Sequence, residues 1–153
     1  MSASIQRALS SYSALEVETG VASASPQRLI IMLYDGALKS VFAAKAAMAR
    51  GDVAGKGEAL SKAISIIDEG LRAALNLEAG GEIAQNLMAL YEYISSRLLQ
   101  ANLKNDATAL DEPARLLSEL KGAWELLEQR DKPAAVVPVE PLERRGSVSL
   151  GKA

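Results

Sequence analysis

The sequence predicts an all-α protein: an antiparallel, up-down-up-down four-helix bundle with a short N-terminal arm and a disordered C-terminal tail. Apolar residues recur at steps of three and four along four long segments, which is typical of helices with one buried face. Short connections of two to six residues separate these segments, so neighbouring helices should be antiparallel. No segment shows the alternating pattern of a strand. We expect the arm in residues 1–24, the bundle in 25–130 and the tail in 131–153.

The first helix is expected from Ser25 to about Arg50, ending before Gly51. Ser25 is a good N-cap residue, and Pro26 suits the first helical position because its missing N–H would have no partner there. The core-facing stripe consists of Ile30, Leu33, Tyr34, Ala37, Val41, Ala44 and Met48. The apolar residues outside this stripe are Ile31, Leu38 and Phe42. A helix with so much apolar surface is either wholly buried or covered by a partner.

The second helix should begin after the N-cap Asp52 and continue to about Asn76. Its core stripe consists of Leu60, Ile64, Ile67, Leu71 and Ala74, with Ile66 and Ala73 off the stripe. The pair Gly80-Gly81 breaks the chain, so the third helix is expected from Glu82 to about Asn105. Its core stripe consists of Ile83, Leu87, Leu90, Ile94, Leu98 and Ala101, and its surplus apolar residues are Met88, Leu99 and Leu103.

The fourth helix is expected from the N-cap Asp106 to about Arg130. Its inward residues are Leu110, Leu117, Leu120, Trp124 and Leu127. Pro113 would interrupt this helix because it cannot donate a backbone hydrogen bond and clashes with the preceding turn. We expect a kink there, or a restart with Asp111 or Glu112 as a new cap.

Composition excludes several function classes. The chain has no histidine and no cysteine, so the commonest general base and metal ligands are missing, and we expect no enzyme activity, no metal and no cofactor. A formal net charge of −2 gives no basic footprint for nucleic acid. No apolar run is long enough to span a membrane, and the first residues lack the core of a signal peptide, so the expected location is cytoplasmic. The stretch from Gly51 to Gly57 is one residue too short for a phosphate-binding loop and ends in glycine instead of Ser or Thr.

Separated blocks of sequence resemble the FliS-type flagellar secretion chaperones over about residues 9–130. The first block is Ser25–Lys39, and the second signature block comprises Leu77–Leu87, Leu90–Tyr93 and Ala101–Asp106. Tyr12 upstream and Trp124 downstream match the same pattern. The family motif residues are Ser25, Pro26, Tyr34, Asp35, Gly36, Gly80, Gly81, Glu82 and Trp124. Each also has a structural explanation: the Gly80-Gly81 pair suits a C-cap and a turn, and Trp124 suits a core anchor.

The resemblance implies a chaperone that binds the C-terminal segment of flagellin in the cytoplasm, prevents premature polymerisation and supports delivery to the flagellar export gate. Surplus apolar residues on several helices would form the binding grooves, by the helix-in-groove mode. The expected flagellin-binding residues are Leu9, Tyr12, Ile31, Leu38, Phe42, Ile66, Met88, Leu99, Asn102 and Leu103. The arm with Leu9 and Tyr12 could cover part of the groove until flagellin displaces it.

One alternative function remains open: a self-associating helical scaffold that uses the same surplus apolar residues without specificity for flagellin. The chaperone should be a monomer or a weak homodimer when free, whereas the scaffold should already be a stable dimer.

Overall fold

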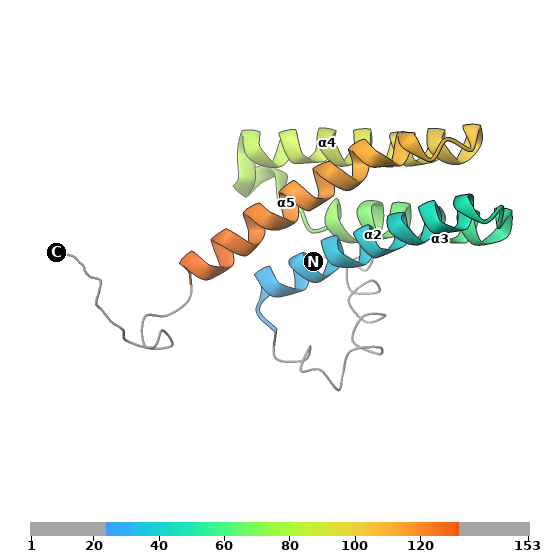
Figure 1. Cartoon of the computed structure of the whole chain (residues 1–153). Coiled ribbons are helices and arrows are strands. Elements are labelled where there is room, and N and C mark those ends of the chain that lie inside the picture. The colour runs from blue at the N-terminus through green and yellow to red at the C-terminus, as the bar shows by residue number, and fades with distance from the viewer. Residues whose placement is uncertain (1–23, 132–153) are drawn as a thin grey trace, which may run out of the picture.

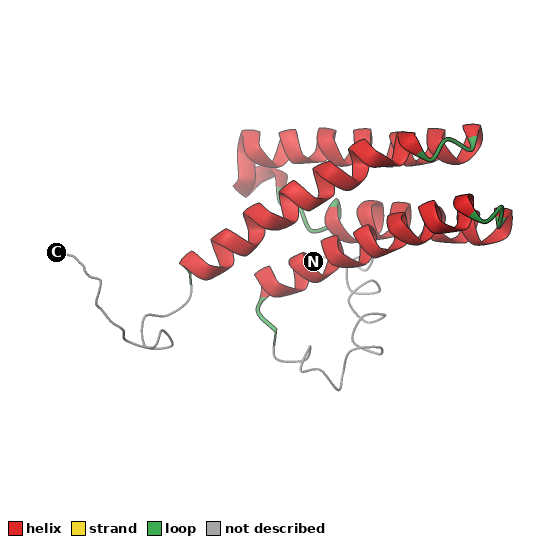
Figure 2. Cartoon of the chain, in the orientation of Figure 1, coloured by secondary structure: helices red, strands yellow, loops and turns green. Residues whose placement is uncertain are grey.

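A computed structural model describes residues 24–131, and these residues form only helices and turns (Figures 1 and 2). The elements are α2 (Pro26–Ala49), α3 (Val53–Ser65), the π-helix η3 (Ile66–Leu71), α4 (Leu77–Lys104), the 3₁₀ turn η4 (Thr108–Leu110) and α5 (Asp111–Arg130). The predicted all-α class is confirmed. The N-terminal arm and nearly all of the C-terminal tail lie outside the described residues.

Helix α2 begins and ends where the sequence predicted. The Ser25 hydroxyl accepts a hydrogen bond from the backbone N–H of Arg28 at 3.1 Å, and Pro26 follows as the first helical residue. After Ala49 the chain turns through Gly51, whose φ of +72° is a conformation that favours glycine. The cap and the glycine stop are therefore both confirmed.

Helix α2 is buried over a wider arc than predicted, because it contacts α3, η3 and α5. The predicted stripe residues Leu33, Tyr34 and Val41 are fully buried. Ile31 and Leu38, which we placed outside the core, are also buried, with exposed fractions of 1% and 7%. The prediction that they lie outside the core is wrong, because neighbouring elements cover both sides of the helix.

The predicted second helix is divided into α3 and η3. Asp52 is its N-cap, as predicted, and accepts from the Gly55 N–H at 2.9 Å. After Ser65 the helix widens, and the Arg72 N–H bonds to the carbonyl oxygen of Ile67, five residues back, at 2.8 Å. The changed register buries the adjacent residues Ile66 and Ile67 together. The placement of Ile66 outside the core is therefore wrong.

Helix α4 includes a short first turn from Leu77, before the predicted break at Gly80-Gly81, and the expected third helix follows that break. Asn76 is its N-cap and accepts from the Ala79 N–H at 3.0 Å, and the helix then bends at Gly81, which has φ +56° and ψ −132°. Ile83 follows the bend and is 73% exposed, so its predicted place in the core is wrong. Farther along, Ile94 and Leu98 are fully buried, as predicted.

Helix α5 restarts near Pro113, as expected, but with a different cap. The turn η4 precedes it, Leu110 occupies the N-cap position, and Pro113 lies in the first turn, where the helix tolerates a missing N–H. Neither Asp111 nor Glu112 is the cap. Along its length α5 is paired with α2 by ion pairs from Lys45 to Asp111 at 2.6 Å and from Lys121 to Asp35 at 3.2 Å.

Candidate partner-binding surfaces

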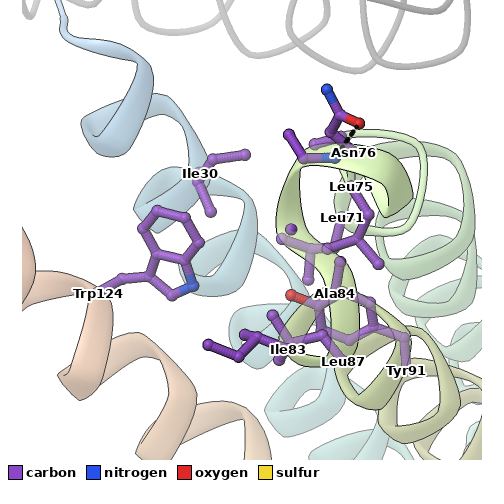
Figure 3. A pocket seen from close by; sticks show the side chains of 12 residues that line it. Ile30, Leu71, Leu75, Asn76, Ile83, Ala84, Leu87, Tyr91 and Trp124 are labelled. Atoms are coloured by element: carbon purple, nitrogen blue, oxygen red, sulfur yellow. Dashed lines mark hydrogen bonds between the residues drawn. The ribbon is translucent and has the colours of Figure 1, made fainter.

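An apolar pocket of about 370 Å³ lies between α2, the end of η3, α4 and α5 (Figure 3). Its lining residues are Ile30, Leu71, Ala74, Leu75, Asn76, Ala79, Gly80, Ile83, Ala84, Leu87, Tyr91 and Trp124. None of them carries a charge. The volume falls within the range of about 300–1,000 Å³ that is common for ligand sites. The pocket is therefore suited to apolar side chains.

Two tyrosines and the tryptophan form a polar group inside this apolar region. The hydroxyls of Tyr34 and Tyr91 are hydrogen bonded to each other, and the Trp124 indole N–H donates to the Tyr34 hydroxyl. The two tyrosine rings are tilted by 56°, with centroids 6.3 Å apart. Burial raises the pKa of both hydroxyls. Their polar atoms are thus paired with each other, and a ligand in the pocket need not satisfy them.

Of the two glycines of the motif, Gly80 lines the pocket and Gly81 directly follows it. A Cβ at Gly80 would lie 2.6 Å from the Cβ of Ala84, and Gly81 has a positive φ. The predicted need for φ > 0 is confirmed at Gly81. The backbone leaves helical geometry at Gly81, between a short first turn that follows Asn76 and the long helix that comes after it, so the predicted break is confirmed.

A second apolar surface follows the outer side of α4. Met88, Leu99 and Leu103 are spaced by eleven and four residues, which places them along one face of the helix. Leu99 is 50% exposed and Leu103 76%, while Met88 and Asn102 are half-buried. The neighbouring Leu98 is fully buried, so Leu99 and Leu103 lie at the edge of the face of α4 that packs into the bundle core.

The remaining predicted binding residues fall into three groups. Phe42 on α2 is 56% exposed, so its side chain is accessible to a partner. Ile31, Leu38 and Ile66 are packed in the core and have little surface to offer a partner. Leu9 and Tyr12 lie outside the described residues. The structure therefore leaves the outer row of α4 and Phe42 as the accessible part of the predicted set.

Other motif residues have structural partners. Asp35 binds Lys39 at 3.1 Å and Lys121 at 3.2 Å. Burial pushes the pKa of the Asp35 carboxyl upward, but these two lysines outweigh it and hold the pKa below its usual value. Gly36 is buried within α2, and Glu82 is exposed. Asp35 thus contributes to the contact between α2 and α5.

Sequence reasoning missed the pocket and the role of Lys56. Lys56 is buried, with an exposed fraction of 7%. Its ammonium donates to the Asn102 carbonyl at 3.2 Å and to the Asn105 side-chain oxygen at 3.1 Å. It therefore holds the C-terminus of α4, where a positive charge is favourable. The signal for the pocket was the Gly80-Gly81 pair beside an apolar segment, since a bend in a helix leaves space next to it.

Among residues 24–131, no cluster of three or more carboxylates suited to a metal ion is present. In the same range, every helix is too short or too polar to cross a lipid bilayer.

Comparison with known proteins gives one consistent family. The profile of the family described as "Flagellar protein FliS" matches residues 8–131. The "Flagellar secretion chaperone FliS" of Salmonella typhimurium is 54% identical over 116 residues, covering 76% of this chain and 86% of the relative. The protein of the same name from Escherichia coli is 47% identical, covering 74% and 83%. That from Bacillus subtilis is 36% identical, covering 75% and 84%.

Proposed function

This chain belongs to the FliS family of flagellar secretion chaperones, and from that premise we propose that it binds the C-terminal segment of flagellin in the cytoplasm before export. The family implies an export chaperone whose role is not enzymatic. In this proposal the chain covers the apolar surface of flagellin, prevents premature polymerisation and supports delivery to the export gate. We also propose that the four helices run up-down-up-down, and that the chain is divided into an arm, a bundle and a tail.

The exposed apolar row on α4 is the observation that carries this proposal. A helix on the outside of a self-sufficient bundle would place charged or polar residues where Leu99 and Leu103 lie. These leucines suit the apolar face of an amphipathic or extended segment. Burial of apolar surface contributes about 25 cal/mol per Å², which opposes the few kcal/mol needed to order a flexible segment.

Calorimetric titration of the full chain with a C-terminal flagellin peptide tests the proposal. We expect saturable binding of one peptide per chain, with a negative heat-capacity change from buried apolar surface. A scrambled peptide of the same composition is the control. Equal binding of both peptides, or no binding of either, would contradict the proposal.

Sedimentation of the free chain separates this function from the scaffold alternative. A chaperone should sediment as a monomer or weak dimer and form a one-to-one complex with the peptide. A stable dimer that the peptide leaves unchanged would favour the scaffold.

A further inference from the structure

The apolar pocket beside Trp124 lies apart from the surface used in the proposed function. Its α4 residues, Ile83, Leu87 and Tyr91, face α2 and α5 (Figure 3). The row with Leu99 and Leu103 lies on the outside of the same helix. The pocket is therefore a separate apolar surface, and covering it would be favourable because it removes apolar surface from water.

The described chain ends close to this pocket. The Gln27 side chain donates a hydrogen bond to the Asp131 carboxylate at 2.7 Å, and Arg28 pairs with Glu128 at 2.5 and 3.0 Å. These contacts fix the last turn of α5 against the first turn of α2. Ile30, which lines the pocket, is three residues beyond Gln27, or about 4.5 Å along the helix axis.

The chain that follows Asp131 contains an apolar run of suitable chemistry. Residues 134–139 are Ala-Ala-Val-Val-Pro-Val, and the nearest charged residues on either side of this run are Lys132 and Glu140. The family profile ends at residue 131, so this run is additional to the part that matches the family. An extended residue spans about 3.3 Å, so Val139 can reach roughly 26 Å from Asp131. That distance is ample for a return to the pocket.

We propose that residues 134–139 of this chain dock in the pocket between α2, α4 and α5 and cover Ile83 and Trp124. The run has no polar side chain and the pocket has no charged lining residue, so the two surfaces match in chemistry. Pro138 favours an extended conformation over a helix. The arm differs from this run, because its apolar residues Ile5, Leu9 and Tyr12 are spaced for a helix and alternate with polar residues. The docking does not depend on flagellin.

Disulfide trapping in the full chain tests this docking, since the natural sequence has no cysteine. The test variant carries Ile83→Cys and Val137→Cys, and Ile83 is exposed enough to change without disturbing the core. The matched control adds Val136→Asp and Val139→Asp to the same cysteine pair, which keeps the loop length and removes the apolar run. Under mild oxidation we expect the control to form the intramolecular disulfide roughly tenfold more slowly, because docking raises the local concentration of the two thiols.

Three outcomes would overturn the inference. The first is a trapping rate that the two aspartates leave unchanged, which would mean that Val137 meets Ile83 only by random collision. The second is faster trapping of an Ile83→Cys and Tyr12→Cys pair, which would assign the pocket to the arm. The third is a disulfide formed mainly between chains, which would assign it to a second copy. Because no flagellin is present, none of these results bears on the proposed function.

Discussion

At the scale of single residues, Leu98 and Leu99 are neighbours on α4 with opposite environments. Leu98 is fully buried and Leu99 is 50% exposed. The difference arises because successive residues of a helix point about 100° apart. One leucine should therefore serve folding and the other binding, and substitution of each can separate the two roles.

Leu98→Glu should unfold the bundle or leave it without fixed packing. A buried carboxylate without a partner costs several kcal/mol, against a typical total stability of about 5–15 kcal/mol. Leu99→Glu should change stability by only about 0.5 kcal/mol, as is usual at the surface, but should weaken flagellin binding by placing a charge in a desolvated contact. Thermal melts and peptide titrations of both variants give the comparison. If Leu99→Glu binds the peptide as the parent does, the outer row of α4 is not the binding surface.

The tyrosine pair predicts how stability depends on alkaline pH. Burial raises the pKa of Tyr34 and Tyr91 in the folded chain above the ordinary value near 10. The folded state therefore holds these protons more tightly than the unfolded state, and this contribution is complete below pH 10 and lost as the pH rises further. The melting temperature of the parent should fall above about pH 10.

A Tyr34→Phe and Tyr91→Phe double variant separates this effect from lysine titration. The double variant lacks both phenols, so its melting temperature should fall less steeply over the same pH range. Parallel curves for parent and variant would show that the alkaline loss comes from other groups.

At the scale of elements, the bend of α4 and the π-helix η3 both depart from regular helices beside the pocket. Gly81 makes the bend with φ +56° and ψ −132°, and Leu71 at the end of η3 lines the pocket. Both irregular segments therefore border the pocket.

Gly81→Ala should destabilise the chain by about 1–3 kcal/mol, because residues with a side chain rarely adopt this backbone conformation. Gly57→Ala is the matched control. Gly57 lies inside α3 with open space where a Cβ would stand, so alanine there should stabilise the chain by about 0.5–1 kcal/mol. Urea unfolding of both variants measures the two changes. A Gly81→Ala variant as stable as the parent would mean that the bend is not required.

At the scale of the whole molecule, one continuous core joins the helices. It includes Tyr34 of α2, Leu60 of α3, Ile67 of η3, Leu98 of α4 and Leu117 of α5. Ion pairs from α5 to α2 lie outside this core and should add little, since exposed pairs are usually worth about 0–1 kcal/mol. Cohesion therefore comes mainly from shared apolar contacts.

A shared core predicts that the helices unfold together. Trp124 is the only tryptophan of the chain, so its fluorescence reports on the contact of α5 with the pocket, while far-ultraviolet circular dichroism reports on all helices. The two transitions should coincide in a urea titration, as expected for a small two-state domain. An earlier transition in the fluorescence would show that α5 and the pocket open separately.

Sequence patterns were enough to predict the all-α class, the helix starts after Ser25 and Asp52, and the stop at Gly51. These features depend on interactions within three or four residues, such as the N-cap hydrogen bonds to Arg28 and Gly55. The family resemblance likewise rested on short local motifs, and the matching family profile bears it out.

Which apolar residues are accessible depends on how the helices pack, and sequence patterns did not predict it. Ile31 and Leu38 are buried because α2 has neighbours on both sides, and Ile66 is buried because η3 changes the helix register. Ile83 is exposed because α4 bends just before it. Each of these outcomes depends on neighbouring elements or on a change in helix geometry, whereas a helical wheel assumes an unbroken period of 3.6 residues and one buried face.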